Sequence, residues 1–211
     1  MTGRVRPGIR AILASSAVLI LLAAMALDTK VIKIGSAADV RSDVFSSVTY
    51  GKSKFPEVRA LIERRAADAA TVAAALTKDQ TAAEKQYGVA ADAGSEMSVK
   101  FTGKAGKQDA GVYDVAVAGV PNTIHITVQT GPAISGTDLR DATGTITFGQ
   151  FSNQIDYQNA GSALNKEMKT QVLSKVDTGS LAGKTISVVG VFQLTDPGEW
   201  VVTPVKLDVV R

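Results

Sequence analysis

The chain has 211 residues, of which 45% are hydrophobic and 20% charged, which suits one ordinary domain with a buried core plus an appendage. It carries 23 Lys and Arg against 20 Asp and Glu. Arg4, Arg6 and Arg10 account for the whole excess, because removing these three leaves 20 basic residues against 20 acidic ones. The remainder is neutral, which argues against a nucleic-acid-binding protein. With no cysteine, the chain can have no disulfide, no thiolate chemistry and no sulfur-ligated metal site.

Residues 1–28 predict a signal peptide or a membrane anchor. The basic start MTGRVRPGIR precedes an uncharged, apolar run over residues 11–27. Spanning a bilayer takes ~20 apolar residues and a secretory signal has roughly 7 to 15, so the length of this run leaves both alternatives open. Ala24-Met25-Ala26 resembles a cleavage site; without cleavage, a transmembrane helix would keep the arginines in the cytoplasm. Both alternatives place the rest of the chain on the periplasmic side of the cell inner membrane.

Residues 29–88 predict a linker followed by a helical segment. Apolar residues recur at helical spacing from Phe55 onward, and Pro56 suits the first turn of a helix. Thr77-Lys78-Asp79-Gln80 has the form of a capping box, which predicts a second helix that ends at Gly88. We therefore expect two helices between residues 55 and 87.

Residues 89–211 are richer in Gly, Thr and Val, and short runs of alternating polarity predict strands. The clearest is TIHITV, in which Ile124, Ile126 and Val128 face inward. Strands are predicted at residues 97–102, 111–117, 123–128, 145–151, 185–193 and 200–209. Pro204 must lie at an edge or a bulge, because it cannot donate to a strand ladder.

About three strands, then a helix, then two strands is the order of an OB-type Greek-key barrel. We therefore predict a mainly β fold with helices (α+β), in which residues 89–211 form an OB-like five-stranded barrel behind the helical pair. A β-sandwich is the alternative.

Residues 140–165 contain polar and aromatic residues where a core strand would have Val, Ile and Leu. A bulge at Gly149-Gln150 would return Phe151 to the interior and place Asn153 on the same core-facing row. A buried amide costs roughly 1–3 kcal/mol unless its hydrogen bonds are made. Asn153 therefore either ties down neighbouring backbone or belongs to a ligand- or partner-binding site. The candidates for that site are Arg140, Asn153, Gln154, Tyr157, Asn165 and Trp200.

A further helix is predicted after this stretch, with Ser162 as its cap. Its apolar stripe comprises Leu164, Met168 and Val172. Lys166 and Lys169 lie away from the stripe, on a face expected to be solvated. Asn165 is expected to form local hydrogen bonds, and Trp200 to fill the core or one end of the barrel.

No motif for catalysis or metal binding is recognised. His125 is the one histidine, on the polar side of a strand, and a single imidazole without clustered carboxylates does not make a zinc site. Asp138 and Asp141 flank Arg140 and are expected to cap backbone amides or to balance its charge. We therefore predict a protein that is not an enzyme and that uses no metal and no cofactor.

The segments LRDATGTITFGQFSNQIDY, SALN, LAGKTISVVGVF and WVVTPVKLDV, together with MALDTKVIKIG, resemble an uncharacterised bacterial family of predicted periplasmic lipoproteins. Genes of that family often lie beside ribose-type sugar ABC transporters. The resemblance covers nearly the whole chain and is most specific over residues 139–165. It implies an exported, membrane-associated domain with an accessory role near a sugar importer, and no catalytic residues. The cysteine that carries the acyl chain of a lipoprotein is missing here, so a transmembrane anchor is expected in its place.

We therefore expect a membrane-tethered, non-enzymatic extracytoplasmic domain that binds a protein partner, a component of a sugar-uptake system. The alternative is a small carbohydrate-binding OB module that uses Asn153, Gln154, Tyr157 and Trp200. An oligonucleotide-binding OB protein and a hydrolase are less favoured.

Overall fold

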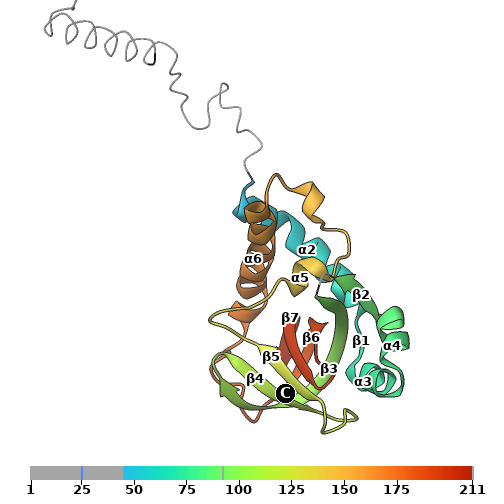
Figure 1. Ribbon diagram of the computed structural model, residues 1–211. Helices are drawn as coiled ribbons and strands as arrows, with labels where there is room; N and C mark the ends of the chain where they lie inside the picture. Colours follow the sequence, from blue (N-terminus) through green and yellow to red (C-terminus); the bar gives the residue numbers. More distant parts are fainter. Residues whose placement is uncertain (1–24, 26–44, 92, 211) are drawn as a thin grey trace, which may run out of the picture. The chain divides into compact units, whose positions relative to one another are not determined.

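The computed structural model describes residues 25, 45–91 and 93–210 (Figure 1). The predicted signal peptide or anchor and the linker that follows it, residues 1–44, lie outside this part, apart from Met25. Phe45–Arg211 forms one compact unit. Among the described helices, none combines the length and the apolar character needed to cross a membrane.

Helix α2 (Ser47–Arg65) begins earlier than the sequence suggested. Ser46 is its N-cap, and the Ser46 hydroxyl accepts a hydrogen bond from the backbone N–H of Thr49 at 3.4 Å. Pro56 lies inside the helix, so the prediction that it occupies the first turn is wrong. The apolar face is as predicted, because Phe55 and Val58 are buried.

The predicted first helix is in fact two helices, since α2 ends at Arg65 and α3 (Ala69–Lys78) follows it, whereas the predicted second helix is α4 (Gln80–Tyr87), which ends at its C-cap Gly88 as expected. Asp68 caps α3 and Asp79 caps α4. Thr77, which was expected to open the second helix, lies in the last turn of α3. A carboxylate at a helix start accepts a backbone N–H and interacts favourably with the helix dipole, so Asp79 makes the better cap.

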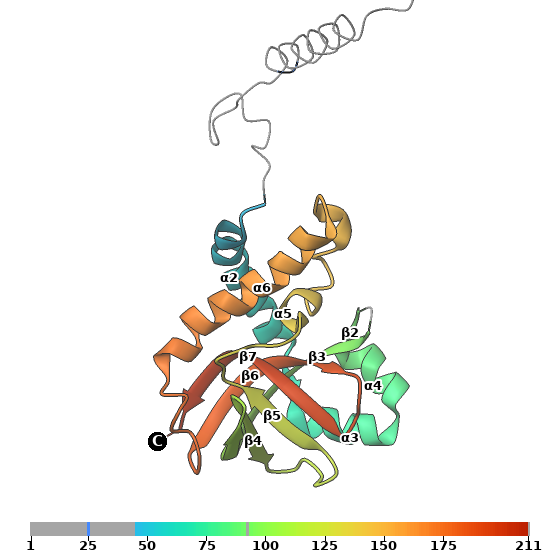
Figure 2. The same cartoon turned by 60° about the vertical axis from the view of Figure 1, so that its left-hand side comes forward.

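The sheet has seven strands. They are β1 (Ala67–Asp68), β2 (Gly88–Ala91), β3 (Gly94–Asp109), β4 (Val112–Val117), β5 (His125–Gln129), β6 (Thr185–Leu194) and β7 (Glu199–Val209). The strand order is β1-β3-β4-β5-β7-β6, with β2 paired to β3 and with a further pairing between β3 and β6 (Figure 2). Five strands, β3 to β7, thus follow the predicted order and form a ring of pairings.

Two further strands, β1 and β2, also pair with β3. The expected five-stranded barrel is therefore corrected to a seven-stranded sheet in a mixed α+β fold. The cause is the 16-residue strand β3, which is far longer than the predicted strand at 97–102. Over Ser95–Lys104, one edge of β3 pairs with the whole of β6, while β2, β1 and β4 pair with β3 in succession along its length.

The predicted strand at 145–151, with its bulge at Gly149-Gln150, is wrong. This segment is irregular and ends in a short 3-10 helix, η1 (Phe148–Gln150). The Thr143 hydroxyl accepts hydrogen bonds from the backbone N–H groups of Thr145 and Ile146, at 3.1 and 3.0 Å. These donors are therefore not available to a strand ladder.

Helix α6 (Gln154–Gln171) begins two turns before Ser162, the residue expected to cap it. Asn153 is the cap, since its Oδ1 accepts a hydrogen bond from the backbone N–H of Asp156 at 2.9 Å. The predicted apolar stripe of Leu164, Met168 and Val172 is confirmed as buried. A second 3-10 helix, η2 (Leu173–Lys175), follows α6.

The long helices α2 and α6 contact each other and lie together with the short helix α5 (Asp138–Asp141) on one side of the sheet, whereas α3 and α4 lie beside β1 to β3 (Figures 1 and 2). Trp200 is fully buried in the core, as predicted, and stacks on Phe192 with 4.4 Å between ring centroids. Pro204 lies where the pairing of β6 with β7 shifts register, so the predicted bulge is confirmed.

Candidate functional site

Arg140 connects α5 to α6, and only 5% of its surface is exposed. Its Nε and Nη2 donate to the two carboxylate oxygens of Asp141, at 2.7 and 3.1 Å. Its Nη1 donates to the backbone carbonyl of Tyr157 at 3.0 Å. The guanidinium carbon lies 3.6 Å from the centroid of the Tyr157 ring, a cation–π contact. The expectation that an aspartate balances Arg140 is confirmed for Asp141.

Two further acids lie near this contact, Glu96, which is fully buried, and Asp138, which is partly buried. Glu96 of β3 is fully buried; its Oε1 accepts a hydrogen bond from Gln193 at 3.1 Å, and its Oε2 has no partner among the described residues. Burial, and next the carboxylates of Asp138 and Asp141, raise the pKa of Glu96 to about 8. The Glu96 carboxyl is therefore protonated at neutral pH.

Asp138 differs from Asp141 in facing the sheet. Its carboxylate accepts a hydrogen bond from the hydroxyl of Thr203 on β7 at 3.0 Å. Burial raises the pKa of Asp138 to about 6, although the bond from Thr203 acts in the opposite direction. The bond from Thr203 to Asp138 therefore attaches α5 to strand β7 of the sheet.

Five aromatic side chains form a continuous group, called here the aromatic cluster, at the N-terminal ends of α2 and α6. Its members are Phe45, Tyr50, Phe148, Phe151 and Tyr157. Neighbouring ring centroids lie 5.2 to 5.9 Å apart. Phe148 is 50% exposed, and the four other rings are partly buried.

Two aliphatic side chains add apolar surface in the same helix turns. Val48 in the first turn of α2 is 53% exposed, and Ile155 in the first turn of α6 is 71% exposed. Scattered exposed apolar residues need no explanation, but an exposed group of rings and aliphatic side chains is typical of an interaction surface.

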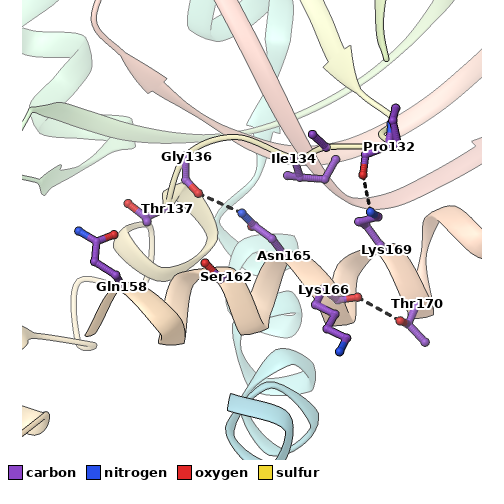
Figure 3. A pocket seen from close by; sticks show the side chains of 11 residues that line it. Pro132, Ile134, Gly136, Thr137, Gln158, Ser162, Asn165, Lys166, Lys169 and Thr170 are labelled. Carbon is purple, nitrogen blue, oxygen red and sulfur yellow. Dashed lines mark hydrogen bonds between the residues drawn. The ribbon is translucent and has the colours of Figure 1, made fainter. Parts of the chain in front are cut away.

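A second feature is a groove between residues 132–137 and α6, called here the α6 groove (Figure 3). Its volume is about 710 Å³, within the range of small-molecule sites. The Nδ2 of Asn165 donates to the Gly136 carbonyl at 3.0 Å, and the ammonium of Lys169 donates to the Pro132 carbonyl, so the loop is attached to the helix at two points (Figure 3).

The structure brings together only part of the predicted site. Arg140 and Tyr157 are in direct contact, and Asn165 lies in the α6 groove. Asn153 and Gln154 are exposed at the start of α6, so the prediction that Asn153 faces the core is wrong. Trp200 is fully buried, and its Nε1 donates to the Pro197 carbonyl at 3.0 Å.

The described residues give no sign of a reactive centre. His125 is exposed on β5, and no three His, Cys, Asp or Glu side chains within residues 45–91 and 93–210 could hold a metal ion together. The acids nearest Arg140 are engaged by Arg140, Gln193 and Thr203. The described residues present a partly exposed aromatic surface and a polar groove.

Comparison with known families gives a match to predicted periplasmic lipoproteins (DUF2291) over residues 17–208. The chain belongs to this family. Membership agrees with the resemblance found in the sequence. It describes this DUF2291 member as an extracytoplasmic, membrane-associated protein of unknown function. The match includes the aromatic cluster, Arg140 and the α6 groove.

Among solved structures, this DUF2291 protein is similar to an OB-fold protein from Thermotoga maritima, with a TM-score of 0.62 and 18% sequence identity. The similarity covers 79% of this chain and 99% of the other. At that identity it establishes the OB-like fold alone. Comparison with curated proteins finds no match.

Sequence reasoning missed Glu96, four of the five rings and the groove lysines. Glu96 could have been suspected as a lone acid in the strand-like run SEMSV. The groove could have been found from Asn153 and Asp156, which have the spacing of a helix cap. With the helix begun there, Ser162, Asn165 and Lys169 fall on one face.

Proposed function

We propose that this DUF2291 protein is a non-enzymatic accessory component of a sugar ABC transport system, tethered to the inner membrane by its N-terminal segment. In this proposal the periplasmic domain binds a protein of that system through the aromatic cluster. Support comes from membership of a predicted periplasmic lipoprotein family and from the apolar run in the first 28 residues. The single observation that carries the binding role is the aromatic cluster, which is partly exposed and has the half-exposed ring of Phe148 among its members.

The cluster suits a binding surface because its rings are held in place. Tyr157 is fixed from below by the guanidinium of Arg140, and its ring contacts those of Phe148 and Phe151. Aromatic side chains dominate the binding energy of many protein interfaces, and rings that are already ordered lose little entropy on binding.

The charges around the cluster favour a protein over a lipid surface. A helix that binds anionic lipid is rich in Lys and Arg on its polar face. The first turn of α2, SVTY, carries no charge, and the first turn of α6, QIDY, carries only the acid Asp156. Aromatic rings with few charged residues beside them are typical of the core of a protein interface.

Photocrosslinking in cells tests this proposal. A photoreactive amino acid is placed at Phe148 or at Ile155 in the full chain, and crosslinked proteins are identified by mass spectrometry after irradiation. We expect a subunit or the binding protein of a sugar ABC transporter at both positions.

Val201 on β7 provides the matched control, because it is an apolar side chain with 46% exposure and lies outside the cluster. A photoreactive residue there should not give the same product. Equal yields from all three positions, or recovery of no transport component from Phe148 and Ile155, would contradict the proposal.

A further inference from the structure

The α6 groove has a chemical character of its own, separate from that of the aromatic cluster. The helix contributes residues 158, 162, 165, 166, 169 and 170, which follow one another along a single face of α6. The opposite wall is the loop at residues 132–137 (Figure 3). A groove of about 710 Å³ accommodates a molecule of metabolite size.

Positive charge prevails in the groove. Lys166 and Lys169 both line it, and no acid does. Neither lysine forms a salt bridge within the described part of the chain; the Lys169 ammonium is bound to a backbone carbonyl. A groove with two ammonium groups and no carboxylate attracts an anion.

The acids nearest in sequence are directed elsewhere. Asp138 follows the groove loop, but its carboxylate accepts the hydroxyl of Thr203 on the sheet. Glu167 lies between the two lysines in sequence but is buried, and it accepts a hydrogen bond from Gln171 at 2.9 Å. The lysines therefore have no internal counter-ion in the groove.

The remaining polar side chains that line the groove are uncharged, and the Thr137 hydroxyl among them is already bonded to Asp141 and Arg140. Ser162, Thr137 and Thr170 contribute hydroxyls, and Gln158 contributes an amide. Asn165 is 93% buried, with 7% of its surface exposed, and its Oδ1 has no hydrogen-bond partner among the described residues. An unpaired buried carbonyl oxygen destabilises the fold, and a ligand hydroxyl that donates to it would remove this cost.

We propose that the α6 groove binds a small hydroxylated anion, a molecule with a carboxylate or phosphate group and several hydroxyl groups. Lys166 and Lys169 would bind the charged group, and the Asn165 Oδ1 would accept from a hydroxyl. This site is distinct from the aromatic cluster, so the domain can present a protein surface at one end of α6 and a ligand groove along its side.

Isothermal titration calorimetry of the full chain tests the groove with defined probes. Gluconate and ribose 5-phosphate represent the two anion types, inorganic phosphate is the anion without hydroxyls, and ribitol is the neutral polyol. We expect saturable binding of gluconate or ribose 5-phosphate, at least tenfold tighter than that of inorganic phosphate and of ribitol. A comparison of the affinities for gluconate and ribose 5-phosphate then shows whether the groove prefers a carboxylate or a phosphate.

Two double variants show whether binding depends on the groove. Lys166→Gln with Lys169→Gln should weaken binding at least tenfold, with a small fall in the melting temperature from the lost bond between Lys169 and the Pro132 carbonyl. Lys78→Gln with Lys85→Gln removes the same charge from exposed positions on α3 and α4 and should leave the affinity unchanged. The proposal is overturned by no heat with either hydroxylated anion, by equal affinity for ribitol, or by equal losses in the two double variants.

Discussion

Arg140 holds both the ring and the backbone of Tyr157. Its guanidinium carbon lies 3.6 Å from the ring centroid, and its Nη1 donates to the carbonyl of the same residue at 3.0 Å. The other edge of the guanidinium is occupied by Asp141. One buried cation thus joins α5 to the first turns of α6 and supports the aromatic cluster from beneath.

Replacing Arg140 with Lys tests this role. An ammonium keeps the charge but cannot donate to both oxygens of Asp141 and to the Tyr157 carbonyl while stacking on a ring. We expect the free energy of unfolding, measured by urea denaturation, to fall by roughly 2–4 kcal/mol, as for other broken buried ion pairs. Arg59→Lys is the control, since Arg59 pairs with Glu63 on the exposed surface of α2 and its replacement should cost less than about 0.5 kcal/mol. Equal small losses in the two variants would show that Arg140 does not hold the cluster.

Glu96 predicts an unusual dependence of stability on pH. Its pKa is raised from the ordinary value of 4.5 to about 8, so the folded state retains a proton that the unfolded state releases. Stability is therefore expected to fall as the pH rises from about 4.5 to about 8, and Glu96→Gln, which is always neutral, should remove this contribution. At pH 7 we expect the variant to be more stable than the parent by roughly 3 kcal/mol, because about 2.5 pH units separate 4.5 from 7 and each contributes about 1.36 kcal/mol.

The measurement is the free energy of unfolding of both proteins at several pH values. Near pH 4 the two should agree, because Glu96 is protonated in the folded and in the unfolded state. The Glu63→Gln variant, which changes an exposed acid of α2 and keeps Glu96, should show the same dependence on pH as the parent. A Glu96→Gln variant that is less stable than the parent at every pH would mean that the buried carboxyl is ionised and paired.

The strands with alternating polarity could be predicted from the sequence, and those with bulges or unequal lengths only in part. Ile126 and Val128 are buried and His125 is exposed, because a strand with one buried face shows its period directly. The added strands β1 and β2 have two and four residues, too few to show a period. Pairing of distant segments along β3 leaves no local signal at all.

The candidate site was misplaced because a helix was read as the continuation of a strand. TITFGQF alternates well enough to suggest a strand, and the polar row that followed was then assigned to the core. Asn153 and Asp156 also have the spacing of a helix cap. Their local hydrogen bonds start a helix at this point, where the strand was expected to continue. Arg140 and Tyr157 were still identified, since a charged residue and an aromatic residue are conspicuous in either interpretation.

Asn153→Ala measures the cap alone. Asn153 donates to the Asp156 carboxylate and accepts from the Asp156 backbone, both at 2.9 Å, at an exposed helix end. We expect a loss of about 1 kcal/mol in the free energy of unfolding, the usual cost of removing an N-cap. Gln154→Ala, at the next and equally exposed position, should change stability by less than about 0.5 kcal/mol. A loss well above 2 kcal/mol for Asn153→Ala would instead point to contacts beyond the cap.

Two phenylalanines of the aromatic cluster separate its structural part from its exposed part. Phe151 contacts the rings of Phe45, Tyr50 and Tyr157, so Phe151→Ala should lower the free energy of unfolding by roughly 2–3 kcal/mol. Phe148 is half exposed and contacts Tyr157 alone among the described rings, so Phe148→Ala should cost no more than about 1 kcal/mol. When the photoreactive residue is placed at Ile155, Phe148→Ala should nevertheless lower the yield of the crosslinked partner strongly, because an exposed ring contributes to binding and little to folding. A loss of stability as large as that of Phe151→Ala, with an unchanged crosslink yield, would assign Phe148 to the core instead.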